Sequence, residues 1–361
     1  MTSAKAKAML FSAAASAALL LVLACRNEPL REEIRFQGST MGTYYSVKII
    51  PDKSSDIPRK RLYDEIQATL DAVDAAMSTF KDDSELTRFN QRQDDLPFHL
   101  SPETAFVFER AREIHHRSSG AFDITIGPLV DAWGFGPQGT ITAPPSREEI
   151  DLLRKATGQD LLTLDAIAST IRKEDPSVHA DLSAIAKGFG VDQVAQRLRD
   201  SGYEDFMVEV GGEVRVSGLN LASQPWRVAI ERPVSRAQSF HRVLELTDIA
   251  LATSGDYRNF IELDGRRISH TIDPRTGYPV SHGVASVTVL HEECVMADAW
   301  ATALTVLGPQ DGMRLAESEN LAVIMLIHGK EGEDSFEELL SSSMSDFLKS
   351  QTRRALSGEA K

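Results

Sequence analysis

Residues 268–308 constrain the fold of this chain more than any other segment, because they predict a strand, a tight turn and a helix in close succession. The segment reads ISHTIDPRTGYPVSHGVASVTVLHEECVMADAWATALTVLG. Helix-forming residues fill Val295–Leu307, and Gly308 followed by Pro309 predicts the end of that helix. Polar groups are unusually dense in this otherwise apolar segment, so we interpret it as half of an active site.

The turn in this segment places two polar side chains near the end of a strand. Asp273 precedes Pro274, and Gly277 follows, which favours a tight turn after the predicted strand RRISHTI. His270 and Asp273 then lie near the strand end, where a rigid turn can hold side chains for chemistry. The plainer interpretation is that DPRTG is only a well-formed turn.

The predicted helix carries a pair of oxygen ligands. Asp298 and Thr302 are four residues apart, so they lie on one helical face. Such a pair suits a hard cation such as Mg²⁺ or Ca²⁺, and suits Zn²⁺ poorly without His or Cys beside it. Alternatively, Asp298 caps or solvates the helix and Thr302 bonds back to a carbonyl.

The pattern along the chain predicts an α+β fold with mixed, largely antiparallel sheets flanked by helices, because strands occur in runs as well as between helices. The 42% of hydrophobic residues suffices for a full core. Helices are expected at 58–77, 101–118 and 146–156, with a short one capped by Ser84. Strands are expected at 34–50 (as a pair or one bent strand), 205–210, 213–217, 226–231, 243–246, 257–263, 267–272, 285–290 and 321–327, with Asp264 and Gly265 forming a hairpin turn.

The N-terminus reads as an export signal. Basic residues precede an apolar run that ends in VLAC, which is typical of a bacterial lipoprotein signal peptide over residues 1–24. The mature chain would begin at a lipid-modified Cys25, followed by a tether over residues 25–33. An uncleaved membrane anchor is the alternative, although the apolar run is short for that. We therefore expect a protein of the bacterial cell envelope that is lipid-anchored to the inner or outer membrane and faces the periplasm.

No linker divides the remainder of the chain. We expect one domain over residues 34–348 and a polar tail over residues 349–361. The net charge of −14 argues against nucleic acid as a partner, since phosphate binding needs clustered Lys and Arg. Only two cysteines occur, so no disulfide framework is expected, and Cys294 is interpreted as a buried small residue.

Two further segments suggest contact with a ligand. In GSTMGTYY, small residues surround Met41 and permit close approach of a ligand or of another backbone, although a β-bulge explains them equally well. In GAFDITIGPLVDAWGFG, Asp123 lies between aromatic residues and glycines. That composition suits the wall of a pocket for a flat ligand, with a structural turn as the alternative.

A third segment, DLSAIAKGFGVDQVAQRL, suggests an anion site at a helix N-terminus. Asp181 or Ser183 can start the helix, and Lys187 lies just inside it with Gly188 and Gly190 keeping the approach open. Free amides and a lysine favour an anion such as a phosphate. The glycine spacing matches neither a P-loop nor a dinucleotide fingerprint.

Taken together, these segments resemble the ApbE family of FAD:protein FMN transferases. The motifs, in the family's order, are TMGTYYSV, STFKDDSELTRFN, GAFDITIGPLVDAWGFG, DLSAIAKGFGVD, VEVGGEVRVSG, ATSGDYRNF, SHTIDPRTGYP and MADAWATALTVLG. The resemblance extends from Phe36 to Ile327 and implies the ApbE-like flavin transferase fold.

The resemblance also implies roles for particular residues. His270 and Asp298 would be catalytic, with His270 at the reacting phosphate. The metal, Mg²⁺, would be held by Asp298, Thr302 and the backbone carbonyl of Ala184. Phe80 stands where the family often has Tyr or Trp. The residues expected to bind FAD, the substrate, are Met41, Phe80, Ala121, Phe122, Asp123, Asp181, Lys187 and Ile272.

The implied reaction transfers the FMN moiety of FAD to a Thr, or less often a Ser, hydroxyl of an acceptor protein and releases AMP. Mg²⁺ and Lys187 would neutralise the pyrophosphate, and His270 or a nearby carboxylate would take the proton of the hydroxyl. The expected acceptors are flavinylated subunits of electron-transfer complexes in the envelope.

Two other functions fit the same residues. With water as the nucleophile, the site would be an Mg²⁺-dependent FAD pyrophosphatase that yields FMN and AMP without an acceptor. A non-catalytic flavin-binding lipoprotein would bind FAD with or without metal and show no turnover. Replacing Asp298 separates the last function from the two enzymes, because it should abolish catalysis and spare most flavin stacking.

Overall fold

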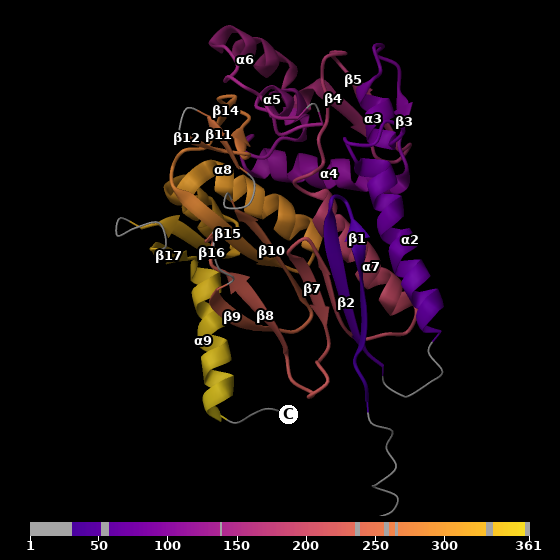
Figure 1. Ribbon diagram of the computed structural model, residues 1–361, viewed down its shortest axis with the longest axis vertical. Coiled ribbons are helices and arrows are strands. Elements are labelled where there is room, and N and C mark those ends of the chain that lie inside the picture. The colour runs from indigo at the N-terminus through magenta and orange to yellow at the C-terminus, as the bar shows by residue number, and fades with distance from the viewer. Residues whose placement is uncertain are drawn as a thin grey trace, which may run out of the picture.

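The computed structural model gives the arrangement of most of the chain (Figure 1). It describes residues 31–51, 58–137, 139–234, 239–255, 260–263, 266–329 and 335–357. The expected signal peptide, Cys25 and most of the expected tether lie outside the described residues.

One large antiparallel sheet forms the centre of the molecule. Neighbouring strands pair antiparallel throughout the sheet. The fold is therefore α+β, as the sequence pattern predicted. In spatial order its strands are β1 (Ile34–Thr40), β2 (Thr43–Ile50), β6 (Asp205–Val210), β7 (Glu213–Ser217), β10 (Ile249–Gly255), β15 (Val284–His291), β16 (Ala322–His328) and β17 (Phe336–Leu340).

Both faces of this sheet are buried, and alternate residues of a strand serve the two faces. In β16, Val323 and Met325 join the core beneath the helices, whereas Ile324 and Leu326 join the core on the other side. A shift of one residue would exchange these two sets, so the two cores fix the register.

Helices cover one face, and a hairpin with one helix covers the other (Figure 1). The helical face carries α2 (Arg59–Met77), α7 (Ala186–Asp200) and α8 (Cys294–Ser318), with α4 (Pro102–Arg117) packed on α8. The opposite face carries the hairpin of β8 (Trp226–Glu231) and β9 (Phe240–Leu246), together with α9 (Ser342–Ser357).

Smaller elements lie beyond the end of the sheet at which α4 crosses (Figure 1). The helical elements are α3 (Glu85–Asn90), η1 (Ile124–Ile126), α5 (Gly127–Ala132), α6 (Arg147–Leu153), η2 (Arg154–Ala156) and η3 (Gln159–Leu161). The strands are β3 (Phe98–His99), β4 (Leu162–Asp165) and β5 (Thr170–Lys173) in one sheet, and the pairs β11 (Phe260–Leu263) with β12 (Arg266–Ser269) and β13 (Ile272–Asp273) with β14 (Tyr278–Pro279).

Helix boundaries follow the local signals in the sequence. The Ser84 and Ser101 hydroxyls accept hydrogen bonds from the first-turn amides of α3 and α4, as expected of N-caps. In α8 the regular helix breaks at Gly308, whose φ of 76° and ψ of −175° are not helical, and helical structure resumes after it as far as Ser318. The predicted stop at Gly308 is thus confirmed as a break between two helical segments.

Several elements were not predicted. β10 occupies the middle of the sheet, but its sequence IALATSG ends in small polar residues with weak strand propensity. β4, β5 and β17 were also missed. Residues 349–357 of the expected polar tail belong to α9, because Phe347 and Leu348 pack against the core and hold this helix on the sheet. Within the described ranges, no helix has the length and apolar character needed to cross a membrane. Residues 256–259 and the expected turn at 264–265 lie outside those ranges.

Candidate active site

Two hairpin turns and two helices meet at one end of the sheet. The β1–β2 turn contains Met41 in a left-handed conformation, with φ of 46°. A Cβ at Gly190 of α7 would lie only 3.0 Å from Met41 Cε, so the helix packs directly on this turn. The β6–β7 turn lies beside it, because the Gly211 amide donates to the Tyr44 carbonyl at 3.0 Å. Gly42 of GSTMGTYY and Gly211 and Gly212 of VEVGGEVRVSG therefore lie in hairpin turns, and Gly38 pairs regularly with Tyr45 within β1 rather than forming a β-bulge.

A lysine and two carboxylates form the centre of this region. Lys187 Nζ lies 2.6 Å from Glu213 Oε1 and 3.7 Å from Asp298 Oδ1. The side chains of Glu213 and Asp298 are 3% and 6% exposed, whereas that of Lys187 is 29% exposed. The ammonium group therefore covers two buried carboxylates and retains access to the outside.

Two groups of this cluster, Lys187 and Glu213, have pKa values above their ordinary values. Burial by itself lowers the pKa of Lys187, but Asp298 and Glu213 outweigh it, so the pKa lies above its ordinary value and the lysine stays charged. Burial raises the pKa of Glu213 to about 7, with Asp298 adding to the rise and Lys187 opposing it. The cluster therefore has one firmly held positive charge beside two acidic groups.

Asp298 caps a neighbouring helix rather than its own. Its Oδ2 accepts a hydrogen bond from the Gly188 amide, in the first turn of α7, at 2.9 Å. The prediction that Asp181 or Ser183 starts α7 is wrong: the helix begins at Ala186, and no side chain caps it from the preceding residue. Asp181 Oδ1 instead accepts a hydrogen bond from the Ser183 amide in the turn before the helix. One amide of the first turn of α7, that of Gly188, is thus taken by a carboxylate of the protein and is not free for an anion.

Gly188 also sets how closely α7 approaches α8. A Cβ at this position would lie 2.4 Å from the Cys294 carbonyl oxygen and 2.8 Å from Asp298 Cβ. No side chain fits there without moving one helix, so glycine is required for the hydrogen bond to Asp298. Cys294 itself is buried, as expected, and burial raises the pKa of its thiol.

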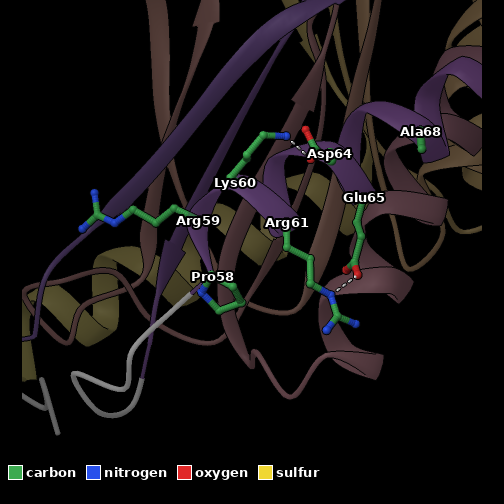
Figure 2. Close-up of a pocket in the computed structure, with 7 residues that line it drawn as sticks. All are labelled: Pro58, Arg59, Lys60, Arg61, Asp64, Glu65 and Ala68. Atoms are coloured by element: carbon green, nitrogen blue, oxygen red, sulfur yellow. Dashed lines mark hydrogen bonds and ion pairs between the residues drawn. The ribbon is translucent and has the colours of Figure 1, made fainter.

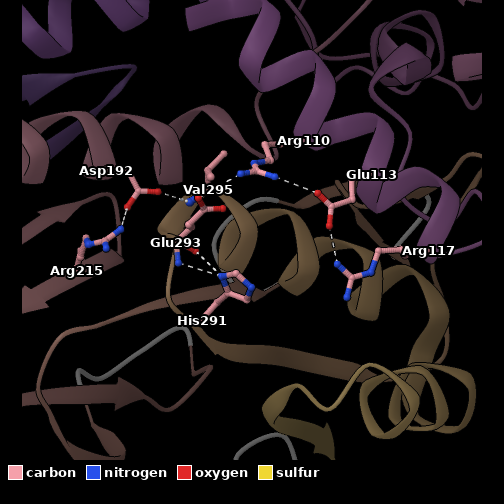
Figure 3. A network of polar contacts seen from close by, with 8 residues as sticks. All are labelled: Arg110, Glu113, Arg117, Asp192, Arg215, His291, Glu293 and Val295. Atoms are coloured by element: carbon pink, nitrogen blue, oxygen red, sulfur yellow. Dashed lines mark hydrogen bonds and ion pairs between the residues drawn. The ribbon is translucent and has the colours of Figure 1, made fainter. Parts of the chain in front are cut away.

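A second aspartate makes the reciprocal contact. Asp192 of α7 accepts a hydrogen bond from the Val295 amide at the start of α8, at 2.9 Å, and also accepts from Arg215 of β7 (Figure 3). Each helix therefore supplies a carboxylate to the N-terminus of the other, where the helix dipole favours negative charge. This exchange fixes α8, and with it Asp298, relative to α7.

The residues predicted to hold a metal fit an oxygen-ligated ion. In a regular helix the Gly188 amide would donate to the carbonyl of Ala184, but it donates to Asp298 instead. Among the described residues no backbone amide donates to the Ala184 carbonyl, which leaves this oxygen available to another partner. Thr302 lies one helical turn after Asp298 and is partly exposed. A carboxylate, a hydroxyl and a carbonyl are ligands that Mg²⁺ accepts.

Other metal classes have less support. The part of the chain that the structure describes contains no group of three or more His, Cys, Asp or Glu side chains placed to hold a metal ion. The soft or nitrogen-rich ligand sets that favour Zn²⁺ are therefore not found there.

The motif around Asp123 is more buried than expected. Asp123 accepts hydrogen bonds from the amide and hydroxyl of Thr125 and lies 3.3 Å from His115 Nδ1, and burial raises its pKa. The side chains of Ala121 and Phe122 are buried, and the Phe122 carbonyl bonds to His115. Their side chains contribute to the core, so contact between FAD and Ala121 or Phe122 remains a prediction.

The remaining predicted residues lie on separate elements. His270 directly follows β12, and its ring centroid lies 6.2 Å from that of Phe135. Ile272 is buried on β13, a strand that contacts α8. Phe80 follows α2 and is 67% exposed, which suits a side chain that covers a flat ligand.

Glu213 and Asp192 were missed by sequence reasoning. A signal was present, because in EVRVS the charged residues Glu213 and Arg215 alternate with valines of a strand buried on both faces. Charged residues on a buried face require partners from the covering layer, here α7. The identity of those partners is not visible in the sequence.

An open cavity at the start of α2 is unrelated to this cluster. It is lined by Pro58, Arg59, Lys60, Arg61, Asp64, Glu65 and Ala68 (Figure 2). Its charged side chains pair along the helix, Lys60 with Asp64 and Arg61 with Glu65. None of the predicted site residues lines it.

Known proteins share both the sequence and the fold. The model of the ApbE family matches residues 41–325. An FAD:protein FMN transferase of Vibrio cholerae is 44% identical over 334 residues, covering 92% of this chain and 98% of that protein. One from Escherichia coli K12 is 38% identical, covering 93% of this chain and 96% of that protein.

Two solved structures superpose on the fold. The flavin transferase ApbE from Vibrio cholerae has a TM-score of 0.80 and 43% identity, with 88% of this chain and all of that chain covered. The apo form of the Pseudomonas stutzeri flavinyl transferase ApbE has a TM-score of 0.79 and 36% identity, with 88% and 97% covered.

Proposed function

The chain belongs to the ApbE family and is an FAD:protein FMN transferase, and we propose that its reaction takes place where the β1–β2 turn, α7 and α8 meet. FAD is the donor substrate and another protein is the acceptor. The observation that supports this location is the buried Asp298 carboxylate, which lies beside both the charged Lys187 and the N-terminus of α7.

We further propose that the site uses Mg²⁺, held by Asp298, Thr302 and the Ala184 carbonyl. When bound, the ion would act as a Lewis acid and neutralise part of the negative charge of the phosphates. The support is that all three groups offer oxygen atoms, and that among the described residues no backbone amide donates to the Ala184 carbonyl.

The side chains then have separate tasks. Lys187 would bind a phosphate oxygen of FAD and neutralise part of the charge that repels a nucleophile. His270 would accept the proton of an acceptor Thr or Ser hydroxyl as its oxygen attacks the phosphorus of the FMN half. A new phosphorus–oxygen bond forms to the acceptor, and the bond to the bridging oxygen breaks. AMP leaves with that electron pair, and FMN remains joined to the acceptor by a phosphoester.

The experiment compares the purified chain with Asp298→Asn, using FAD, Mg²⁺ and an acceptor protein. Asparagine keeps an oxygen that can accept from Gly188 but loses the charge that a metal needs, so helix capping and metal binding are separated. Transfer, measured as covalent flavin on the acceptor by mass spectrometry and as released AMP, should fall about 100-fold or more. Thermal stability should change little.

Asp311→Asn serves as the control, because Asp311 is an exposed residue of the same helix region. It should transfer flavin like the wild type. Full activity of Asp298→Asn would contradict the proposed site. Release of FMN and AMP at a rate that no acceptor changes would instead favour a pyrophosphatase.

We also propose that the protein is lipid-anchored through Cys25 in the bacterial envelope, faces the periplasm, and modifies subunits of envelope electron-transfer complexes. The described part of the chain enters the sheet at the end of β1 away from the proposed site. Seven-residue β1 runs from Ile34, near the expected tether, to the turn at Met41, a span of about 24 Å. Loss of palmitate labelling in Cys25→Ser would test the anchor.

A further inference from the structure

We propose that Glu213 is a positioning residue that holds the Lys187 ammonium away from Asp298, so that this carboxylate stays free for a divalent cation. The inference rests on the proposed Mg²⁺ site and assigns to Glu213 a role that the reaction itself does not require. Glu213 would touch neither the metal nor FAD, and would act through Lys187.

The geometry shows a competition between two carboxylates for one cation. Lys187 Nζ makes a hydrogen bond of 2.6 Å to Glu213 Oε1, whereas 3.7 Å separates it from Asp298 Oδ1. Opposite charges at these distances attract strongly when they are shielded from water. Without Glu213, the ammonium would be drawn to Asp298 and would occupy the oxygen that a metal needs.

The lysine stem allows this movement. A Cβ at Gly211 would lie 3.3 Å from Lys187 Cδ, so the stem runs along the β6–β7 turn. Only the end of the side chain has to rotate to exchange Glu213 for Asp298. The partner of the ammonium group is therefore decided by which carboxylates are present, and not by the packing of the stem.

The second oxygen of Glu213 indicates that this ion pair is not there for stability alone. Glu213 Oε2 is buried and has no hydrogen-bond partner among the described residues. A buried carboxylate oxygen without a partner is unfavourable, and apolar residues often replace a buried ion pair without loss of stability. A functional constraint on Lys187 explains why a carboxylate occupies this position.

The same strand and helix provide a matched comparison. Arg215 of β7 pairs with Asp192 of α7 (Figure 3). Arg215 lies two residues after Glu213 on the strand, and Asp192 lies five residues after Lys187 on the helix. This second ion pair joins the same two elements and is also largely buried. It lacks a connection to Lys187, so removing its carboxylate changes charge and stability at the interface without releasing the lysine.

The test measures Mg²⁺ binding to the full chain by calorimetry, and the Mg²⁺ dependence of flavin transfer. In Glu213→Gln, the Mg²⁺ concentration at half-saturation should rise about tenfold in both measurements, because Mg²⁺ must then displace the Lys187 ammonium from Asp298. A tenfold change corresponds to about 1.4 kcal/mol of binding free energy. The transfer rate at saturating Mg²⁺ should stay within about threefold of wild type. Asp192→Asn loses the charge that pairs with Arg215 but keeps an oxygen that can accept from the Val295 amide, so α8 and Asp298 should stay in place. Its Mg²⁺ half-saturation should therefore be unchanged, even if it melts at a lower temperature.

Lys187→Gln supplies an independent measurement by calorimetry. Removing the ammonium should lower the Mg²⁺ half-saturation below that of wild type, and adding Glu213→Gln to this variant should then have no further effect. An effect of Glu213→Gln that persists without Lys187 would overturn the proposal, because Glu213 would then act on the metal directly. An unchanged half-saturation in Lys187→Gln would overturn it even if Glu213→Gln did not fold.

Failure of this inference is distinguishable from failure of the proposed function. If wild-type transfer depends on Mg²⁺ and Glu213→Gln shows the same dependence, only the role of Glu213 is wrong. If wild-type transfer is as fast in EDTA as in Mg²⁺, the proposed metal site is wrong, and the proposed role of Glu213 is then wrong as well.

Discussion

Two lysines of this protein, the buried Lys173 and the partly buried Lys187, have opposite surroundings. Lys173, at the end of β5, donates to three backbone carbonyls, those of Asn90, Pro176 and Val178, at 2.9, 3.0 and 3.1 Å. All three of its N–H groups are therefore used within the protein, and burial lowers its pKa to about 8. Lys187 instead faces two carboxylates, and its pKa is raised.

The difference shows that neighbours, and not burial alone, decide what a buried lysine does. Lys173 joins the loop after β5 to the end of α3, and no part of its ammonium group remains for a ligand. Lys187 is held charged by Glu213 and Asp298 and remains partly exposed. We therefore interpret Lys173 as structural and Lys187 as a residue that binds an anionic substrate.

The largest expected effect is loss of flavin transfer in Lys187→Met. Removing the ammonium leaves the phosphates of FAD without their nearest positive side chain, so transfer should fall about 100-fold or more. Stability should suffer little, because Glu213 already has a pKa near neutrality, about 7, and can take up a proton. The rate of covalent flavin formation and the melting temperature measure the two effects.

Lys173→Met provides the comparison for this variant, since it removes the other buried ammonium group. Its transfer rate per folded molecule should equal that of wild type. Comparable loss of transfer in both variants would show that the two lysines do not differ as proposed.

Much of the fold could be predicted from local sequence. Caps at Ser84 and Ser101 and the break at Gly308 each depend on residues within one turn, so the sequence contains the whole signal. β10 could not be placed in this way, because its small residues become a central strand only through pairing with β7 and β15. Tertiary pairing there overrides weak strand propensity.

The candidate site divides in the same manner. Helical spacing suggested Asp298 and Thr302 as a pair of metal ligands, and the position of Lys187 near a helix start suggested an anion site; both roles remain predictions. The hydrogen bond between Asp298 and Gly188 joins residues far apart in the sequence, as does the ion pair of Lys187 with Glu213. Periodicity within one element contains no information about such contacts between elements.

A smaller effect is expected on the stability of Lys173→Met. Methionine fits an apolar environment but leaves three buried carbonyls without donors, so the free energy of unfolding should fall by about 3 kcal/mol. Urea denaturation measures this change. Lys349→Met, at an exposed position of α9, should change stability by less than about 0.5 kcal/mol. Equal stability of Lys173→Met and wild type would show that the carbonyls find other partners.

The smallest expected effect is a dependence of stability on pH that Lys173 contributes and Lys187 does not. Its pKa is about 8 in the folded protein and 10.5 ordinarily, so between these values the unfolded chain holds a proton that the folded chain does not. The contribution of Lys173 to stability therefore rises with pH across this window, by at most about 1.4 kcal/mol per pH unit, and is flat below it. Because the pKa of Lys187 is raised, its stabilising contribution is complete below pH 10.5 and is lost only as pH rises through the higher folded value.

The measurement is the free energy of unfolding of wild type and of each variant from pH 7 to 10. The difference between wild type and Lys173→Met should rise above pH 8. The difference between wild type and Lys187→Met should show no rise that comes from the lysine. A flat difference for Lys173 would mean that its three carbonyls keep the ammonium charged, and the two lysines would then differ in their partners but not in their charge.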